Sequence, residues 1–175
     1  MPSPARGEGR QQRTKNMIKW LWLSFAVIVL DQITKRIAEY QLVQFAPMEI
    51  LPFLNFTLVY NQGAAFSFLS DAGGWQRWFF TVLAIGVSMI LVWWMAKLQR
   101  EEAGTAAGLA LIVGGAIGNV IDRIWHGHVI DFIDMHYAGY HWPVFNIADS
   151  AITVGAVWLI AANLLQGVKP PPKAS

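Results

Sequence analysis

Long runs of apolar residues alternate with short polar segments along this chain. Three runs without a charged residue, each 19 residues long, cover positions 78–96, 103–121 and 150–168. A helix of that length, rising about 1.5 Å per residue, matches a bilayer core of roughly 30 Å. The pattern therefore predicts three membrane-spanning helices, at about 77–96, 103–122 and 149–168.

A fourth apolar stretch lies nearer the N-terminus and begins behind two lysines. A basic start before a short apolar core is typical of a signal peptide, but small residues of a cleavage site do not follow it here. Instead the apolar positions continue at helical spacing, with Asp31 and Lys35 one turn apart. We expect a retained first spanning helix over about 17–38, in which these two residues form an ion pair.

The segments between the spans predict a small sheet. Residues 52–60 are rich in aromatic and β-branched residues, and the turn signal Asn61-Gln-Gly63 follows them before residues 64–69 resume an apolar run. We expect a hairpin or curved sheet that lies against the helix ends at the membrane surface. It could hold an extended peptide along a strand edge, or it could only plug the bundle.

These elements form one domain. The predicted fold is an α-helical membrane protein with four transmembrane helices and a small extracytoplasmic β-sheet at the outer membrane interface. The domain covers residues 17–168, between a disordered tail at 1–16 and a second tail at 169–175. Gly114, Gly115 and Gly118 in the third span suit close helix packing, which predicts that this helix is central.

Composition agrees with the membrane prediction and excludes several classes of protein. The chain is 55% hydrophobic and 14% charged, with a mean hydropathy of +0.39, too apolar for an ordinary soluble domain. It has no cysteine, which excludes disulfides, a thiolate nucleophile and cysteine metal ligands. Despite a net charge of +2, no basic stripe with stacking aromatic residues indicates binding to nucleic acid.

The distribution of basic residues predicts the orientation. With four spans both termini lie on one side, and nine of the 13 Lys and Arg residues fall on that side. By the positive-inside rule both termini are cytoplasmic, and segments 39–76 and 122–149 face outward. Eight of the nine tryptophans lie near predicted span ends, as expected for interfacial residues, and only Trp158 is predicted in mid-span.

Two aspartates bracket the second outward segment. Alternation along residues 129–135 would put Asp131 on an apolar face and Asp134 on the opposite one. Asp149 follows Asn146 by three residues, a helix-start pattern close to the capping box, and taken alone it could be a simple capping acid. Two carboxylates that meet can share a proton, so that one activates water and the other donates. We expect Asp131 and Asp149 to meet and to hydrolyse a bond.

Their positions also predict how the roles divide. Asp149 is expected in the first turn of a helix, where the dipole favours a negative charge, whereas the apolar neighbours of Asp131 favour its neutral form. We therefore assign the ionised base to Asp149 and the protonated acid to Asp131. The two would titrate as a coupled pair.

Other polar residues lie beside the acids. Asn119, Asp122 and Arg123 share one face at the outer end of the third span, so Arg123 could pair with Asp122 or with a substrate carbonyl. Asn61 and Asn146 each offer a donor and an acceptor, suited either to a substrate peptide group or to their own turn and cap.

Four segments in order resemble the motifs of bacterial lipoprotein signal peptidase, also called signal peptidase II. The segments are Asp31-Gln-Ile-Thr-Lys35, Asn61-Gln-Gly-Ala-Ala-Phe66, Gly118-Asn-Val-Ile-Asp-Arg123 continuing to Gly127-His-Val-Ile-Asp-Phe132, and Phe145-Asn-Ile-Ala-Asp-Ser150. The resemblance covers about residues 17–168. It implies an intramembrane aspartic peptidase that cleaves prolipoproteins before a diacylglyceryl-modified cysteine.

The resemblance also implies the site. Two catalytic aspartates of the family match Asp131 and Asp149, and no metal or cofactor is expected. The motif residues expected to shape the pocket or hold the substrate match Asn61, Asn119, Arg123, Asn146, Asp31, Lys35 and Asp122. The implied partners are a prolipoprotein and membrane lipid, and the implied enzyme is a monomer in the bacterial inner (cytoplasmic) membrane, with its active site facing outward.

Three other functions remain open from the residues alone. A zinc hydrolase could use Asp131 with the four histidines, which are His126, His128, His136 and His141. A Ser/Lys peptidase could use Lys35 with Ser67 or Ser70. A non-catalytic carrier or assembly scaffold would also explain four spans and an outer sheet.

Overall fold

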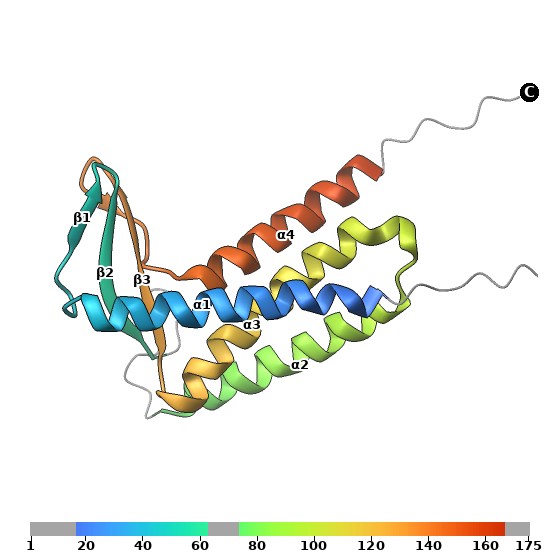
Figure 1. Cartoon of the computed structure of the whole chain (residues 1–175), viewed down its shortest axis with the longest axis horizontal. Coiled ribbons are helices and arrows are strands. Elements are labelled where there is room, and N and C mark those ends of the chain that lie inside the picture. The colour runs from blue at the N-terminus through green and yellow to red at the C-terminus, as the bar shows by residue number, and fades with distance from the viewer. Residues whose placement is uncertain (1–16, 63–73, 167–175) are drawn as a thin grey trace, which may run out of the picture.

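The computed structural model describes residues 17–62 and 74–166. Four long helices form a bundle, and a small sheet stands across one end of it (Figure 1). The helices are α1 (Leu21–Gln41), preceded by the short 3-10 helix η1 (Met17–Trp20), α2 (Trp75–Lys97), α3 (Ala103–Trp125), preceded by η3 (Arg100–Glu102), and α4 (Ile147–Gln166). The start of η1 and the end of α4 lie at the end of the bundle opposite the sheet (Figure 1).

The helical membrane fold with a small antiparallel sheet is confirmed. Three helical segments are long and apolar enough to cross a membrane, namely Met17–Gln41, Trp75–Lys97 and Arg100–Trp125. The apolar part of the fourth helix is shorter and covers Ile147–Ala162 in the part that the structure describes. That α4 crosses the membrane stays a prediction, as do the two predicted tails, which lie outside the described residues.

α3 is the central helix, as its glycines predict, and it packs against each of the other three. A Cβ atom at Gly114 would lie 2.8 Å from the backbone oxygen of Ser24 in α1. At Gly115 it would lie 2.2 Å from the backbone oxygen of Ala148 in α4. Only glycine permits these approaches. They bring the backbones of α1 and α4 close to α3.

Trp158, predicted in mid-span, lies beside the start of α3. Its indole N–H donates to the backbone oxygen of Gly104 over 2.8 Å. α4 thus crosses α3 with this tryptophan near the end of the bundle that is opposite the sheet, and its polar atom is satisfied by the neighbouring helix.

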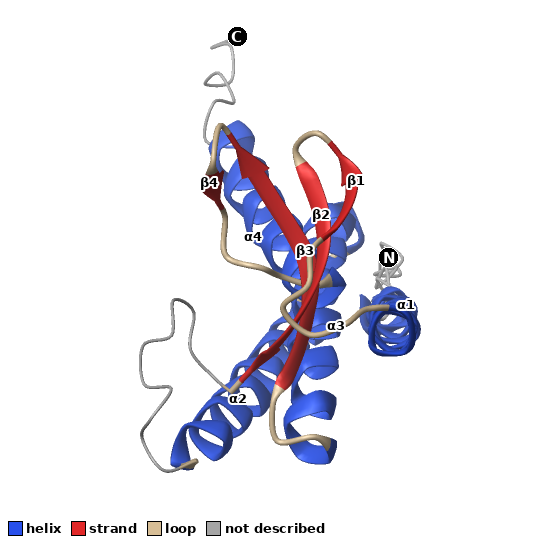
Figure 2. Cartoon of the chain, turned by 90° about the vertical axis from the view of Figure 1, so that its left-hand side faces the viewer, coloured by secondary structure: helices blue, strands red, loops and turns tan. Residues whose placement is uncertain are grey.

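The sheet has four antiparallel strands in the order β1-β2-β3-β4. They are β1 (Met48–Leu51), β2 (Leu54–Asn61), β3 (Val129–Tyr137) and β4 (Tyr140–His141). Seen from the sheet side, β2 and β3 run across the ends of the helices (Figure 2). Residues 64–69, expected to pair with 52–60, lie outside the described residues, and the partners observed for β2 are β1 and β3.

The register of the two central strands, β2 and β3, determines which side chains lie on the same face as Asp131. Val59 lies opposite Asp131 and Asn61 opposite Val129, after a bulge between Phe56 and Val59. Because paired residues of neighbouring strands share a face, Asn61 and Asp131 point to the same side of the sheet. The bulge shifts the register by one residue, and without it this side of β2 would present a different set of side chains.

Candidate active site

The start of α4 holds Asp149 through a reciprocal cap. The side-chain oxygen of Asn146 accepts from the backbone N–H of Asp149 over 2.9 Å, and Oδ2 of Asp149 accepts from the backbone N–H of Asn146 over 3.3 Å. This is a capping box, so the sequence prediction of a cap at Asn146 is confirmed. The cap fixes the Asp149 carboxylate in the first turn of α4.

Strand β3 holds Asp131, which is 2% exposed. Nδ2 of Asn146 donates to its Oδ1 over 2.6 Å, and Nδ2 of Asn61 donates to its Oδ2 over 3.0 Å. Asn146 therefore contacts both acids, Asp131 through its side chain and Asp149 through the cap. One residue at the strand-to-helix junction thus brings the two carboxylates to one place.

A second amide joins the pair from α3. Nδ2 of Asn119 donates to Oδ1 of Asp149 over 2.8 Å, and Oδ1 of Asn119 accepts from Nδ2 of Asn146 over 3.2 Å. The acids are thus held by three amide side chains, one each from β2, α3 and the start of α4. Amides donate hydrogen bonds without supplying a positive charge, so they orient the carboxylates without neutralising them.

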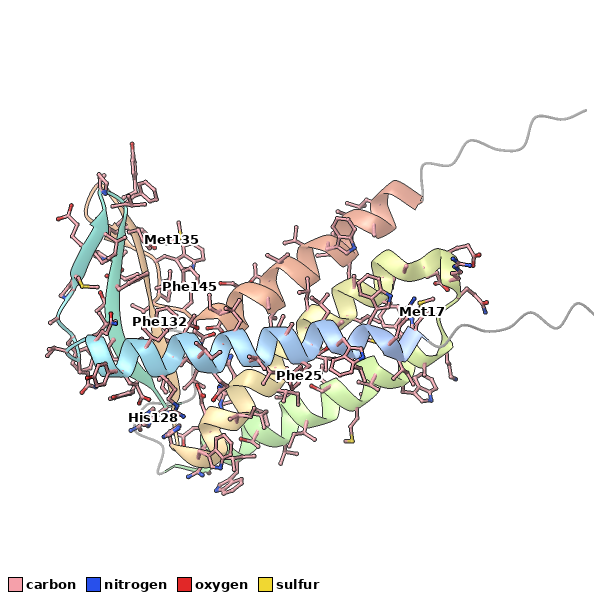
Figure 3. The ribbon with its side chains drawn as sticks, viewed as in Figure 1. Met17, Phe25, His128, Phe132, Met135 and Phe145 are labelled. Atoms are coloured by element: carbon pink, nitrogen blue, oxygen red, sulfur yellow. The ribbon has the colours of Figure 1, made fainter. Side chains whose placement is uncertain are left out.

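A cavity of about 1020 Å³ opens beside both acids. Asp131, Asp149, Asn61 and Arg123 line it, together with sheet residues and with residues of α2 and α4. The further lining includes Phe53, Phe80, Met135, Trp142, Phe145 and Val154. Figure 3 places Met135 and Phe145 between the strands and the start of α4. Two carboxylates at the wall of one largely apolar cavity are the arrangement expected of a binding or catalytic site.

Asp131 has a perturbed acidity. Burial, and then the nearby charge of Asp149, raise the pKa of Asp131 from 3.8 to about 7, against the hydrogen bonds from Asn61 and Asn146, which favour the ionised form. Near neutral pH a large share of Asp131 therefore carries its proton. The geometry thus places a carboxyl group of raised pKa on one side of Asn146 and a second carboxyl group, in the first turn of α4, on the other.

Arg123 is the cation at the cavity wall. Its guanidinium lies 5.7 Å from the centre of the Phe80 ring, and its Nη1 makes a long hydrogen bond of 3.4 Å to the backbone oxygen of Asn119. Its Nε atom is buried without a hydrogen-bond partner among the described residues. Arg123 thus places a positive charge at the wall where the two acids lie.

The other three predicted residues form a buried group behind the acids. Nζ of Lys35 lies 2.8 Å from Asp31 and 2.7 Å from Asp122, and all three side chains are essentially unexposed. Nζ also donates to Oδ1 of Asn119 over 2.9 Å. Through Asn119 this lysine cluster, Lys35 with Asp31 and Asp122, touches the amide that holds Asp149.

The lysine cluster also fixes two backbone positions. Asp31 accepts from the backbone N–H of Ala148 over 2.9 Å, in the first turn of α4, and Asp122 accepts from the backbone N–H of Ile130 over 3.2 Å, beside Asp131. Each carboxylate of the cluster thus anchors the segment that carries one of the cavity acids.

The predicted Asp31–Lys35 ion pair is present, but the alternative that pairs Arg123 with Asp122 is wrong. Asp122 turns toward α1 and binds Lys35 instead, because the buried lysine needs a second carboxylate or acceptor from α3. Sequence reasoning also missed Gln32, whose Nε2 donates to Asp122 over 2.8 Å. The signal for it was a polar residue beside Asp31, within the Asp31-Gln-Ile-Thr-Lys35 segment.

The histidines lie in two pairs, and of the four only His136 lines the cavity with the acids. The rings of His126 and His128 are 5.9 Å apart at the end of α3, and those of His136 and His141 stack at 5.0 Å on the β3–β4 hairpin. The hydrogen bonds to Asp131 come from asparagines. Within residues 17–62 and 74–166 no group of three or more His, Asp and Glu side chains could hold a metal ion.

The Ser/Lys alternative has no support at Lys35. This lysine is 0% exposed and bound to two carboxylates, whereas a lysine base needs to be neutral and to reach its serine. Ser67 and Ser70 lie outside the described residues.

Comparison with known proteins identifies relatives along nearly the whole chain. The profile of the family described as signal peptidase (SPase) II matches residues 23–165. The lipoprotein signal peptidase of Teredinibacter turnerae is 53% identical over 147 residues, which cover 84% of this chain and 88% of the relative. That of Acinetobacter baumannii is 51% identical over 160 residues, which cover 91% of each chain.

A solved structure is similar as well. It is described as a bacterial membrane enzyme determined by the in meso method at 2.3 Å resolution. The TM-score is 0.79 at 34% sequence identity, and the match covers 90% of this chain and 94% of that one.

Proposed function

Since this chain belongs to the signal peptidase II family, we propose that it is an aspartic endopeptidase that uses Asp131, Asp149 and one water molecule to remove signal peptides from prolipoproteins. The observation that carries the proposal is the pair of carboxylates at the wall of one cavity, with the pKa of Asp131 raised to about 7. Paired carboxylates of unequal acidity suit general acid and general base catalysis.

The chemistry divides between the two acids. Asp149, ionised at the helix N-terminus, takes a proton from water while the water oxygen attacks the carbonyl carbon of the scissile bond. Asp131 gives its proton to the carbonyl oxygen, and a tetrahedral diol forms. The proton held by Asp149 then passes to the amide nitrogen, one diol hydroxyl returns its proton to Asp131, and the C–N bond breaks. The products are an acid and an amine, and both aspartates regain their starting states.

The surrounding residues hold the two acids and the substrate in position. Asn61, Asn119 and Asn146 orient the acids through hydrogen bonds of 3.0, 2.8 and 2.6 Å. Arg123 lines the cavity, and its guanidinium suits a peptide carbonyl of the substrate. The lysine cluster fixes the backbone on either side. We propose that none of these steps requires a metal ion or an organic cofactor.

The proposed substrate carries a diacylglyceryl group on the cysteine that follows the cleaved bond. The cavity is lined by sheet residues and also by Phe80 of α2 and Val154 of α4. It therefore adjoins the outer ends of helices apolar enough to lie in lipid. A peptide whose lipid stays in the bilayer could then reach the acids without leaving the membrane surface.

We also propose the setting. The enzyme is a monomer in the bacterial inner membrane, with both termini cytoplasmic and the sheet and cavity facing outward. The excess of Lys and Arg on the side of the termini supports this orientation. So does the position of the sheet at the end of the bundle opposite the described chain ends (Figure 1).

The experiment is cleavage by the purified full chain in lipid vesicles. A prolipoprotein with the diacylglyceryl cysteine is expected to be cut at the bond before that cysteine, identified by mass spectrometry, and the unmodified precursor far more slowly. A chelator is expected to leave the rate unchanged. Equal rates on both precursors would contradict the lipid requirement. No cleavage at all would favour the scaffold function, and loss of activity with the chelator would favour a metal hydrolase.

A further inference from the structure

The β3–β4 hairpin is a short arm at the rim of the cavity. Its turn, Ala138-Gly139, has positive φ at both residues, 49° and 81°, as two-residue hairpin turns of type I′ require. β4 has two residues, and beyond it the backbone N–H of Trp142 donates to the backbone oxygen of Met135 over 2.8 Å. So short a ladder gives the arm few backbone bonds, and side-chain contacts must contribute to its position.

One face of the arm carries a polar network. Nδ1 of His141 lies 2.8 Å from Oδ1 of Asp134, and Oγ1 of Thr57 on β2 donates to Oδ2 of Asp134 over 3.0 Å. His136 stacks on His141 and lies 3.3 Å from Oδ1 of Asn55. We call these five residues the polar brace. It ties β4 through β3 to β2.

Asp134 is the centre of the brace and is 4% exposed. Burial alone would raise its pKa, but the hydrogen bonds from His141 and Thr57 outweigh burial and hold the pKa below its ordinary value. The carboxylate is therefore charged, and the hydrogen bonds that it accepts are charge-assisted. Among residues 17–62 and 74–166, the side-chain hydrogen bonds of Asp131 and Asp149 are made with Asn61, Asn119 and Asn146, which lie outside the brace.

The opposite face of the same arm borders the cavity. Successive strand residues point to opposite sides, so the neighbours of the brace residues face the acids. These neighbours are Met135, Tyr137, Tyr140 and Trp142, which line the cavity and which we call the aromatic wall. Trp142 is 63% exposed and Tyr140 is 75% exposed, which leaves large apolar surfaces for a ligand to cover. His136 belongs to the brace and also borders the cavity.

We propose that the Asp134–His141 pair is a positioning pair that holds the aromatic wall in place, so that the wall can select substrates by the apolar group they place against it. The proposal rests on the proposed function. The wall is apolar and adjoins the acids, so the selected group is an apolar side chain beside the scissile bond or an acyl chain of the lipid. The pair lies outside the reacting atoms, and its loss acts on substrate binding and leaves bond cleavage intact.

The test is steady-state cleavage by His141→Leu and Asp134→Asn in lipid vesicles. Loss of the charge-assisted bond is expected to raise KM about tenfold and to change kcat less than about twofold. His141→Asn retains a donor at the place of Nδ1 and is expected to restore most of the affinity. Glu49→Gln, the same carboxylate-to-amide change as Asp134→Asn on the exposed strand β1, is the matched control and is expected to leave both constants unchanged.

Two substrate series identify the selected group. In one, apolar residues before the cleaved bond are shortened to alanine; in the other, the acyl chains are shortened. The wild-type enzyme is expected to discriminate within one series, and His141→Leu to lose that discrimination. Unchanged discrimination and KM in a folded variant, checked by thermal unfolding, would overturn the proposal. So would an equal fall in kcat on every substrate. If the unmutated chain cuts no precursor, the proposed function fails, a result distinct from either.

Discussion

Two pairs of carboxylates, of which only Asp149 is partly exposed, lie side by side in this molecule and have different surroundings. Asp31 and Asp122 share Lys35 at 2.8 and 2.7 Å and accept backbone N–H groups as well. Asp131 and Asp149 are held by asparagine side chains and border a cavity. The first pair has a lysine between its members, whereas the hydrogen bonds of the second pair come from amide groups, with the Arg123 guanidinium at the same cavity wall.

The difference shows how its surroundings suit an aspartate to a structural role or to the proposed catalytic role. A buried carboxylate that contacts a lysine and accepts a backbone N–H group is held in place, and its negative charge has a partner. A buried carboxylate beside another acid, with amide donors only, resists ionisation, and the pKa of Asp131 accordingly rises to about 7. Asn119 joins the two groups, since it accepts from Lys35 and donates to Asp149. Through Asn119, the group of Lys35, Asp31 and Asp122 thus helps to hold the proposed catalytic pair in position.

The largest expected effect is the loss of activity when either of the two proposed catalytic aspartates is replaced. Asp131→Asn and Asp149→Asn are each expected to lower kcat about a thousandfold or more, because each removes a proton-transfer group. Cleavage of the lipid-modified precursor measures the loss, and thermal unfolding checks that both variants still fold. An Asp149→Asn enzyme with wild-type turnover would exclude the two-aspartate mechanism.

The next largest expected effect is a loss of stability when the lysine between Asp31 and Asp122 is removed. Lys35→Met leaves two carboxylates buried without their cation, and we expect the free energy of unfolding to fall by about 3–5 kcal/mol. Denaturant titration in detergent measures it. The matched control is Arg36→Met, one residue further along α1, whose ion pair with Glu39 is partly exposed and is expected to contribute less than about 1 kcal/mol. Equal losses in the two variants would show that Lys35 is not specially placed.

The smallest expected effect is a change in the pH dependence of activity. In the proposed mechanism Asp131 donates a proton, so activity is expected to decline as pH rises through about 7. The hydrogen bond from Asn61 favours the ionised form, and Asn61→Ala is therefore expected to shift this decline to higher pH while lowering the maximal rate about tenfold. Gln62→Ala, at the exposed next residue, serves as control. A shift of the decline to lower pH in Asn61→Ala would reverse the assignment of the acid.

Local patterns made the start of α4 and the ion pair within α1 predictable. The Asn146–Asp149 cap and the Asp31–Lys35 pair are both determined within four residues of chain, where helical geometry alone fixes the distances. The alternation that separates Asp131 from Asp134 is equally local, and the structure keeps it: Asp131 lines the cavity, and Asp134 binds Thr57 and His141.

Contacts between distant segments could not be read in the same way. Asp122 had a plausible partner in adjacent Arg123, and only the packing of α3 against α1 brings Lys35 to it. The pairing of β2 with β3 joins residues about seventy positions apart, and its bulge decides which side chains accompany Asp131. Asn119 was expected near the site, but its place between Lys35 and Asp149 depends on three helices at once.

The cap at the start of α4 has a consequence for how this protein can evolve. Asp149 closes the first turn of its helix with the same carboxylate that borders the cavity. In many enzymes a reactive group is a burden on stability, so that its loss yields a sturdier, inactive protein. Here a mutation at Asp149 forfeits a helix cap together with any role in turnover. We expect a deep mutational scan that scores abundance alone to show intolerance at this position, even in cells that do not need the activity.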